Sequence, residues 1–277
     1  MIKAVNYADN SFRRAQKLNS MTARQWGADE VIEYGPEDID IDFRERNREI
    51  LKSARGGGYY LWKPYVFRKA YDRLGEDDYL IYTDSGSVYV NKIQYLINCM
   101  EQAQVPIMIF SLQKEMLEKK YTKRDAFVLT DCDEPGYTDS PQSIGGYMVC
   151  KRAPEVEAFL NEVLRYAQDI RIISDRKNEQ GLPNYEGFID HRHDQSVISL
   201  MSKKHGIKRF RDPSQYGLIN QYEPEVEARS TYPQIIDSHR FNAGSIWEIK
   251  LKRTKPMMKM NKLRKKIKNK LAQMKET

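Results

Sequence analysis

A carboxylate, Asp84, stands directly after the run YLIYT at residues 79–83, whose apolar and aromatic character is typical of a buried parallel strand. Open α/β sheets bind ligands at the carboxyl ends of their strands. One carboxylate there can bind a divalent cation when phosphate oxygens and water complete the coordination shell. The small residues Ser85 and Gly86 would let a phosphate or a metal ion approach the backbone. The alternative is an ordinary turn, since Asp, Ser and Gly are common turn residues.

A second polar group lies in the segment IDHRHDQS, residues 189–196, before a predicted helix. Asp194 stands at the start of that helix and could simply cap it. His191 and His193 lie just before it in a chain that holds only four histidines, which favours a functional segment over a purely structural one. A His-x-His pair can also bind zinc, but the sequence has no matching cluster of cysteines or histidines.

Lys63 and His239 complete the candidates. Lys63 lies in the context Trp-Lys-Pro and could point at a phosphate, although most lysines face solvent. His239 follows an apolar pair in the segment IIDSHR, where a lone histidine is more often structural than a ligand. Together with the two aspartates, these residues suit a reaction of a nucleotide diphosphate. A metal ion would neutralise the leaving pyrophosphate, and Asp194 would handle the attacking hydroxyl.

Alternating strands and helices are expected to position these residues. Apolar runs predict strands at residues 2–5, 31–34, 79–83, 105–112 and 143–152. Helical periodicity predicts helices at residues 11–29, 63–74, 92–104, 113–130, 153–173 and 194–206. This alternation predicts an α/β domain with a mostly parallel sheet covered by helices on both faces. The polar segment at residues 175–194 is predicted to be a long loop of the kind that often carries function.

The composition is that of a globular protein. The chain has 277 residues, of which 40% are hydrophobic and 31% charged, enough for one large α/β domain or two small ones. The three cysteines, Cys99, Cys132 and Cys150, are an odd and sparse set that favours a reducing compartment. No apolar run is long enough for a signal peptide or a membrane span. We therefore expect a cytoplasmic protein, soluble or attached to a surface.

The basic charge is concentrated at the C-terminus. Residues 250–277 contain 12 lysine and arginine side chains and one acid, whereas residues 1–249 contain 34 basic and 38 acidic side chains. We therefore divide the chain into a domain at residues 1–249 and a basic tail at residues 250–277. Residues 255–277 are predicted to form a basic amphipathic helix that lies on anionic lipid, and its apolar side comprises Met260, Leu263, Ile267, Leu271 and Met274. The alternative is a solvated terminal helix packed on the domain or on another subunit.

Three blocks of the sequence resemble bacterial glycosyltransferases encoded in capsule and lipopolysaccharide O-antigen gene clusters. The block GGGYYLWKPYVFRKAYDRLGEDDYLIYTDSGS is similar to the stretch G-G-G-Y-W-x-W-K-P … D-x-L-x-Y-x-D-x-G of these enzymes. The blocks DSPQSIGGYMVCKR and HRHDQSVISLMSKKHGI resemble later blocks in the same order, so the resemblance spans roughly residues 5–240. It implies a GT-A-like Rossmann-type fold, a nucleotide-sugar donor, a bound Mn²⁺ or Mg²⁺, and transfer of one sugar to a glycan or lipid-linked glycan acceptor. A UDP-hexose of galactose, galactofuranose or glucose is the favoured donor class.

The resemblance also implies roles for individual residues. Asp84 stands where such enzymes place the first Asp of their Asp-x-Asp metal motif, but Gly86 replaces the second Asp, so metal dependence is open. His239 is the candidate for the further ligand that GT-A enzymes supply near their C-terminus. The residues expected to bind the donor are Asn6, Tyr7, Asp9, Lys63, Asp84, Ser85 and Gly86. Those expected to line the sugar or the acceptor are Gln142, Gly145, Gly146, His193 and Gln195.

Asp194 stands where GT-A enzymes carry a functional carboxylate. In an inverting enzyme it would deprotonate the acceptor hydroxyl, whereas in a retaining enzyme Asp194 and Gln195 would contact the sugar. The inverting role is favoured here because His193 could hydrogen-bond the base. A polyprenyl-linked acceptor would be met at the inner face of the cytoplasmic membrane, where the basic tail would hold the enzyme as a peripheral protein.

Two other classes of function remain open at this stage. The missing second Asp at Gly86 is compatible with a catalytically inactive GT-A-like module that binds a glycan or scaffolds an assembly. The lysine-rich tail is compatible with a nucleic-acid binder. Residues 1–249 have an excess of four acidic side chains and thus lack a broad electropositive face, so we expect no nucleic acid partner.

Overall fold

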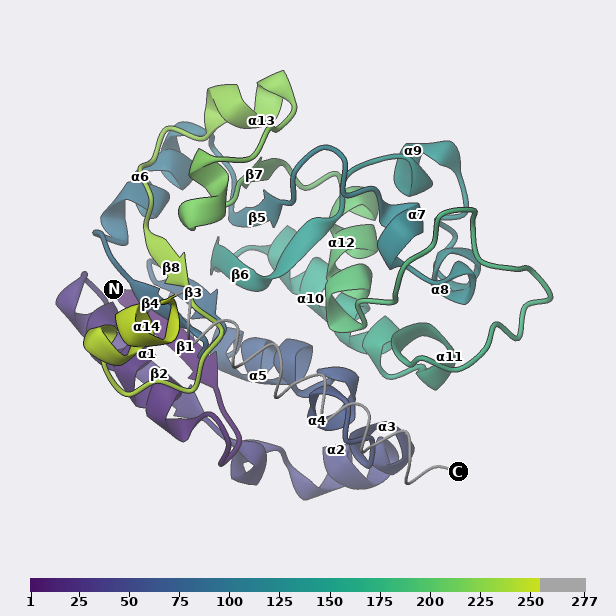
Figure 1. Ribbon diagram of the computed structural model, residues 1–277, viewed down its shortest axis with the longest axis horizontal. Helices are drawn as coiled ribbons and strands as arrows, with labels where there is room; N and C mark the ends of the chain where they lie inside the picture. Colours follow the sequence, from purple (N-terminus) through teal and green to yellow (C-terminus); the bar gives the residue numbers. More distant parts are fainter. Residues whose placement is uncertain (255–277) are drawn as a thin grey trace.

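The computed structural model describes residues 1–254. The predicted amphipathic helix at residues 255–277 lies outside these residues. Within the described part, the strands of the main sheet are β1 (Ile2–Tyr7), β2 (Glu30–Tyr34), β3 (Tyr79–Thr83), β5 (Ile107–Ser111), β6 (Ser143–Lys151) and β7 (Arg209–Arg211). They form one six-stranded sheet in the order β2-β1-β3-β6-β5-β7 (Figure 1).

The sheet is mostly parallel, as the sequence predicts. Strands β1, β2 and β3 pair in parallel, as do β5 and β7, whereas β6 runs antiparallel to both β3 and β5. The opposite direction of β6 brings its first residues to the edge of the sheet where β1 and β3 end. Two short strands, β4 (Ser87–Tyr89) and β8 (Ile236–Ser238), form a separate antiparallel pair.

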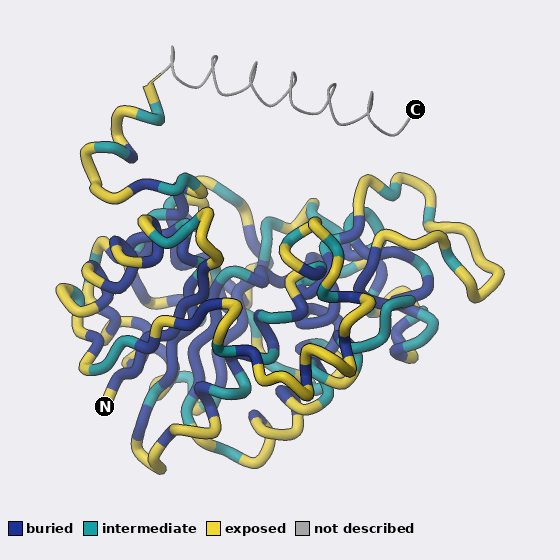
Figure 2. The backbone as a smooth tube through the Cα atoms, turned by 90° about the horizontal axis from the view of Figure 1, so that it is seen from below, coloured by how far each residue is buried: buried dark blue, intermediate teal, exposed yellow. Residues whose placement is uncertain are grey.

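Helices cover both faces of the sheet, which confirms the predicted fold class. The longer helices are α1 (Arg13–Gln25), α5 (Trp62–Tyr71), α6 (Gln94–Gln102), α10 (Pro154–Ala167) and α12 (Asp194–Lys204). Alternate strand residues enter two different cores, because successive side chains of a strand point to opposite faces. Leu80 and Tyr82 pack in a core with residues of α5, α10 and α12, whereas Ile81 and Val149 pack in a core with residues of α6. Figure 2 shows that buried segments of the chain gather in the centre of the molecule.

Short helices occupy the connections. They are α2 (Ile41–Arg46), α3 (Arg48–Leu51), α4 (Gly56–Tyr59), α7 (Glu118–Tyr121), α8 (Arg124–Leu129), α9 (Pro135–Thr138), α11 (Ile170–Ile173), α13 (Pro224–Arg229) and α14 (Ile246–Lys252). Two predicted helices are therefore broken. The segment predicted as one helix at residues 113–130 contains α7 and α8, separated by extended backbone at Thr122 and Lys123. The segment at residues 153–173 breaks after α10, where the Asp169 side chain accepts a hydrogen bond from the Arg171 backbone and starts α11.

The predicted helix after the three glycines is confirmed as α5, and Pro64 lies in its first turn, where a missing backbone donor costs nothing. The turn before α5 is left-handed, since φ is positive at every residue from Gly56 to Tyr60. Glycine is required within it, because a Cβ on Gly58 would lie 2.8 Å from the Leu51 Cα. Tyr59 and Tyr60 adopt the same left-handed region at φ 53° and 63°, which is uncommon for residues other than glycine.

The segment predicted as a long loop is confirmed. Between Ile173 and Asp194 the described chain forms neither helix nor strand, and Figure 1 shows it extending away from α8 and α11. At the other end of the described part, α14 runs across the expected domain boundary at residue 249, and Arg253 forms an ion pair with Asp237. Within residues 1–254, no helix is both long enough and apolar enough to span a bilayer.

Candidate active site

Lys63 links two carboxylates at the carboxyl-end edge of β1 and β3. It belongs to the first turn of α5 and is buried. Its Nζ lies 2.9 Å from Asp194 Oδ2 and 3.2 Å from Asp84 Oδ1. The same Nζ donates a hydrogen bond of 2.9 Å to the carbonyl oxygen of Gly145. The structure therefore brings together four candidates that lie up to 131 positions apart in the sequence, and it directs Lys63 at carboxylates.

The charges of this cluster depend on burial. Burial alone would lower the pKa of Lys63, but Asp194 and Asp84 outweigh it and raise the pKa, so the ammonium stays charged. Burial raises the pKa of Asp194 to about 6, with a further contribution from Asp84 and an opposing one from Lys63. Asp194 Oδ2 accepts no hydrogen bond of good geometry from the described residues and is held by the ion pair. A carboxylate with a pKa of about 6 can accept a proton near neutral pH.

Asp84 is the open member of the cluster. Its side chain is 45% exposed, and the Tyr82 hydroxyl donates a 2.7 Å hydrogen bond to Oδ1. Two glycines of β6 allow the parts to approach each other. A Cβ on Gly146 would lie 3.1 Å from Asp84 Oδ2, and one on Gly145 would lie 2.9 Å from the Gln195 Cβ. These two glycines therefore act through the space that they leave open.

His239 lies beside the same loop. Its backbone N–H donates to the carbonyl oxygen of Gly86 at 3.0 Å, and its Nδ1 accepts from the Phe241 backbone N–H at 3.1 Å. The ring is buried, and Nε2 has no hydrogen-bond partner among the described residues. Burial lowers the pKa of His239 to about 4, so the imidazole is neutral at neutral pH. A buried, neutral and unpartnered ring nitrogen has the chemistry of a metal ligand. Residues 1–254 hold no group of three or more His, Cys, Asp or Glu residues that could bind a metal by themselves.

Asn6, Tyr7 and Asp9, which lie at the end of β1 and were expected to bind the donor, have three different environments. Asn6 is fully buried, and its amide is hydrogen-bonded to Gln16, Asn19 and Ser20 of α1. The Asn6 side chain thus points to the face of the sheet that α1 covers.

Its neighbours reach the site or the surface instead. Tyr7 stacks on Trp62 with ring centroids 3.9 Å apart, and its carbonyl oxygen accepts a 2.6 Å hydrogen bond from the Ser85 hydroxyl. Asp9 is exposed and accepts hydrogen bonds from Ser11.

The two histidines before α12 hold the loop in place. His191 Nε2 lies 2.8 Å from the Ile172 carbonyl oxygen, and His193 Nδ1 lies 2.8 Å from that of Ile173. Arg55 Nε donates to the other His193 nitrogen, Nε2, at 2.7 Å. Both ring nitrogens of His193 are thus occupied within residues 1–254, and the expected hydrogen bond to Asp194 is not made. The backbone of His193 itself has φ 51° and ψ −119°, which is a strained conformation for a residue other than glycine.

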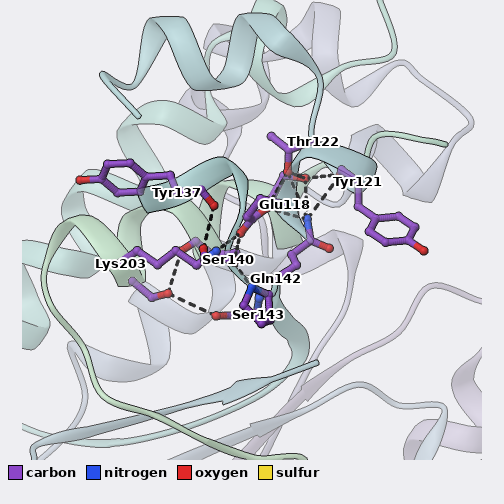
Figure 3. Close-up of polar contacts among 12 residues, drawn as sticks. Glu118, Tyr121, Thr122, Tyr137, Ser140, Gln142, Ser143 and Lys203 are labelled. Carbon is purple, nitrogen blue, oxygen red and sulfur yellow. Dashed lines mark hydrogen bonds and ion pairs between the residues drawn. The ribbon is translucent and has the colours of Figure 1, made fainter. Parts of the chain in front are cut away.

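A second polar network, which is buried, forms around Glu118 (Figure 3). Glu118 is fully buried, pairs with Lys203 Nζ at 2.8 Å, and accepts hydrogen bonds from Ser199 and Thr122. The amide of Gln142 donates to Glu118 Oε2 at 3.1 Å. Burial lowers the pKa of Lys203 to about 8, against the opposing charge of Glu118.

This network continues to Gln195. Gln195 Nε2 donates to Gln142 Oε1 at 2.7 Å, and Gln195 Oε1 accepts from the Gly145 backbone at 3.2 Å. Gln142 and Gln195 therefore connect the buried pair to the residue whose carbonyl binds Lys63. Sequence reasoning missed Glu118 and Lys203, because each lies in a charged stretch that resembles a solvated helix face.

No protein-family model matches the chain, and no curated protein matches its sequence. Among solved structures, the chain is similar to the apo form of mouse xyloside xylosyltransferase 1, with 11% identity and a TM-score of 0.48, over 88% of this chain and 99% of that one. It is also similar to the apo structure of the WbbM bifunctional glycosyltransferase, with 11% identity and a TM-score of 0.39, over 72% of this chain and 37% of that one. Neither similarity identifies the family of this chain.

The substitution Lys63→Met should destabilise the protein by about 3–5 kcal/mol at pH 8, because it leaves Asp194 buried without a partner. The loss should be smaller at pH 5. A carboxyl group whose pKa is higher in the folded than in the unfolded state loses stability as pH rises between the two values, and removal of Lys63 raises the folded pKa further. Urea unfolding of both proteins at pH 5 and pH 8 measures the difference.

The double variant Lys63→Met/Asp194→Asn is the matched control, since it removes both charges. It should recover most of the stability that the single variant loses at pH 8. An equal loss at both pH values, or no recovery in the double variant, would contradict the central role of this ion pair.

Proposed function

We propose that this protein is a glycosyltransferase that moves a hexosyl group from a nucleotide-diphosphate sugar to a glycan acceptor in surface polysaccharide biosynthesis. The observation that supports this most directly is the pairing of an open carboxylate, Asp84, with a buried carboxylate of raised pKa, Asp194, on one lysine. The pair lies at the carboxyl-end edge of a mostly parallel sheet, where such sheets bind ligands. The sequence blocks that resemble capsule and O-antigen glycosyltransferases contain all three residues.

In this proposal Asp194 accepts the proton of the attacking acceptor hydroxyl, and the reaction inverts the configuration at the sugar. A pKa of about 6 suits a base that works near neutral pH. Lys63 holds the Asp194 carboxylate in place and keeps it ionised above that pH. The departing nucleotide diphosphate lies on the Asp84 side, where the exposed carboxylate and the small Ser85-Gly86 turn leave room for it.

The residues around Asp84 fit a divalent cation, Mn²⁺ or Mg²⁺. Asp84 supplies an exposed carboxylate, and His239, whose backbone binds the Gly86 carbonyl oxygen, has a buried Nε2 without a partner among the described residues. Two protein ligands are enough for such an ion when phosphate oxygens and water supply the others. When bound, the cation would neutralise negative charge on the diphosphate.

We also propose that the protein works as a peripheral protein at the cytoplasmic face of the membrane. Helix α14 lies at the outside of the molecule (Figure 2), where Ile249 packs against the domain, and it carries Trp247, which is 71% exposed, and Leu251 one turn further on. Lys250 is exposed on the same helix. Exposed tryptophan next to basic residues suits the interface of an anionic bilayer. The basic stretch at residues 255–277 would continue this contact.

Nucleotide binding should depend on Asp84. Addition of UDP-glucose or UDP-galactose with Mn²⁺ should raise the melting temperature, since a ligand at 100 times its Kd adds about 2.7 kcal/mol of stability. EDTA should weaken the shift, and Asp84→Asn should abolish most of it. Asp77→Asn, an exposed acid just before β3, is the matched control and should behave as the wild type. Absence of any shift with a panel of nucleotide sugars would favour an inactive glycan-binding module instead.

The rate of sugar transfer to water, measured as nucleotide-sugar hydrolysis, should rise with pH and show an apparent pKa near 6, because only ionised Asp194 accepts a proton. Asp194→Asn should lower kcat by about 10²–10⁴-fold with the nucleotide still bound. NMR of the first-formed sugar should show inverted anomeric configuration. A rate that is flat between pH 5 and 7, or a retained configuration, would rule out this role for Asp194.

Binding of the full chain to vesicles should depend on Trp247. Co-sedimentation with phosphatidylserine-containing vesicles should weaken several-fold in Trp247→Ala and should fall with added salt, since the contact combines apolar insertion with charge. Tyr95→Ala, which removes another exposed aromatic side chain on α6, should leave binding unchanged. Equal binding to neutral and anionic vesicles, or no effect of Trp247→Ala, would refute this membrane contact.

A further inference from the structure

An aromatic surface, formed by the exposed Tyr60 and the partly buried Trp62, lies beside the ion-pair cluster. Tyr60 is 37% exposed, and its ring centroid is 6.1 Å from that of Trp62. Lys63 Nζ lies 5.7 Å from the Tyr60 ring centroid and 5.8 Å from that of Trp62. The same Nζ contacts Asp194 Oδ2 at 2.9 Å. The aromatic surface is therefore adjacent to the lysine that holds the carboxylate we assign as the base.

The chain holds this surface in a defined position. The left-handed turn from Gly56 to Tyr60 places Tyr60 in a conformation that is uncommon for its type. The Trp62 Nε1–H donates a 2.9 Å hydrogen bond to the Gly56 carbonyl oxygen, and Tyr7 stacks on the Trp62 ring at an interplanar angle of 14°. One face of Trp62 is thus covered, and its indole N–H is satisfied. The rings are pre-organised before any ligand binds, which reduces the cost of binding.

Charged and polar groups lie along one side of the aromatic surface. Arg55 Nε contacts Asp175 Oδ2 at 3.1 Å and His193 Nε2 at 2.7 Å, and the His193 ring is 6.0 Å from the Tyr60 ring. The Arg55 side chain is 53% exposed. Among the described residues its contacts use Nε, which leaves the terminal guanidinium nitrogens open. The rim therefore offers both hydrogen-bond donors and carboxylate acceptors.

We propose that the Tyr60 and Trp62 surface is the acceptor subsite and binds one sugar ring of the acceptor glycan by stacking. This inference rests on the proposed glycosyl transfer and adds where the acceptor lies. A sugar ring has an apolar C–H face that suits the negative face of an aromatic ring, and its edge carries hydroxyl groups. The Arg55 and Asp175 rim matches those hydroxyls as donor and acceptor. A ring on Tyr60 would present a hydroxyl toward Asp194.

A nucleobase would also stack on aromatic rings, but the observations favour the acceptor. The Tyr60 ring lies 6.0 Å from the ring of His193, the residue directly before Asp194, whereas the exposed Asp84 carboxylate and His239 suit the diphosphate. Donor and acceptor must lie on opposite sides of the reacting carbon when the configuration is inverted. The acceptor is then the ligand that approaches the base.

Saturation-transfer NMR tests this assignment with methyl β-D-galactopyranoside and methyl β-D-glucopyranoside as probes. Irradiation of aromatic protein protons should transfer saturation to ring C–H protons of at least one glycoside. Tyr60→Phe should retain the signal. Tyr60→Ala and Tyr60→Leu should weaken the affinity by about 2- to 10-fold, in the range that aromatic pairs contribute. Melting curves of the variants report whether they are folded.

Calorimetric titration of UDP into the same variants separates this inference from the proposed function. UDP binding that is unchanged in Tyr60→Ala, together with weaker glycoside binding, supports an acceptor subsite. Glycoside signals that are absent, or that are unaffected by Tyr60→Ala and Tyr60→Leu, overturn the subsite even when UDP binds the wild type. A parallel loss of UDP affinity assigns the surface to the donor and also overturns the proposal. Failure of UDP and every other nucleotide to bind the wild type counts instead against glycosyl transfer itself.

Discussion

The ammonium group of Lys63 between Asp84 and Asp194 is the interaction on which the rest of the site depends. A buried charge is tolerated only when it is paired and hydrogen-bonded. Lys63 meets this requirement with two carboxylates and one backbone carbonyl. This pairing is possible only where helix α5, the end of β3, the start of β6 and the start of α12 converge. The fold thus determines the electrostatics of the site, because it decides whether these charges can pair.

Close approach at this point requires glycine on β6. Gly145 and Gly146 face Gln195 and Asp84 at distances that leave no space for a Cβ without movement. The antiparallel direction of β6 places these glycines next to the ends of β1 and β3. A larger side chain at Gly145 would push α12 away and lengthen the contact of Asp194 with Lys63. The close approach of the backbone at Gly145 therefore sets the distance between the Lys63 and Asp194 charges.

The buried polar groups around Glu118 and around the two histidines before α12 are paired within residues 1–254, which favours one arrangement of the surrounding elements. Glu118 and Lys203 connect α7 to α12, and the His191 and His193 rings connect the long loop to α11. Buried polar networks of this kind are costly when incomplete, so alternative packings are disfavoured. Against this background two buried atoms stand out among residues 1–254: Asp194 Oδ2, whose contact is the ion pair with Lys63, and His239 Nε2, which has no hydrogen-bond partner there.

The sequence by itself determined the class of fold and several positions of the site. Apolar strands and amphipathic helices alternate clearly enough to predict the sheet, because burial on both faces requires that pattern. A carboxylate after β3 and one at the start of α12 were also predictable from local pattern. The sequence did not predict the antiparallel direction of β6, because that depends on pairing with strands far away in the chain. It also did not predict the breaks in two helices, where extended backbone at Thr122 and Lys123 and the Asp169 cap interrupt the periodicity locally.

Tertiary structure decided which candidate side chains face the site. Asn6 and Tyr7 are neighbours on β1, yet one pairs with α1 and the other stacks beside Lys63, because successive strand residues face opposite sides. Lys63 was expected at a phosphate and lies between carboxylates. His193 was expected to hydrogen-bond Asp194 and instead binds Arg55 and a backbone carbonyl. Such pairings join residues far apart in the chain, so only packing of the whole domain determines them.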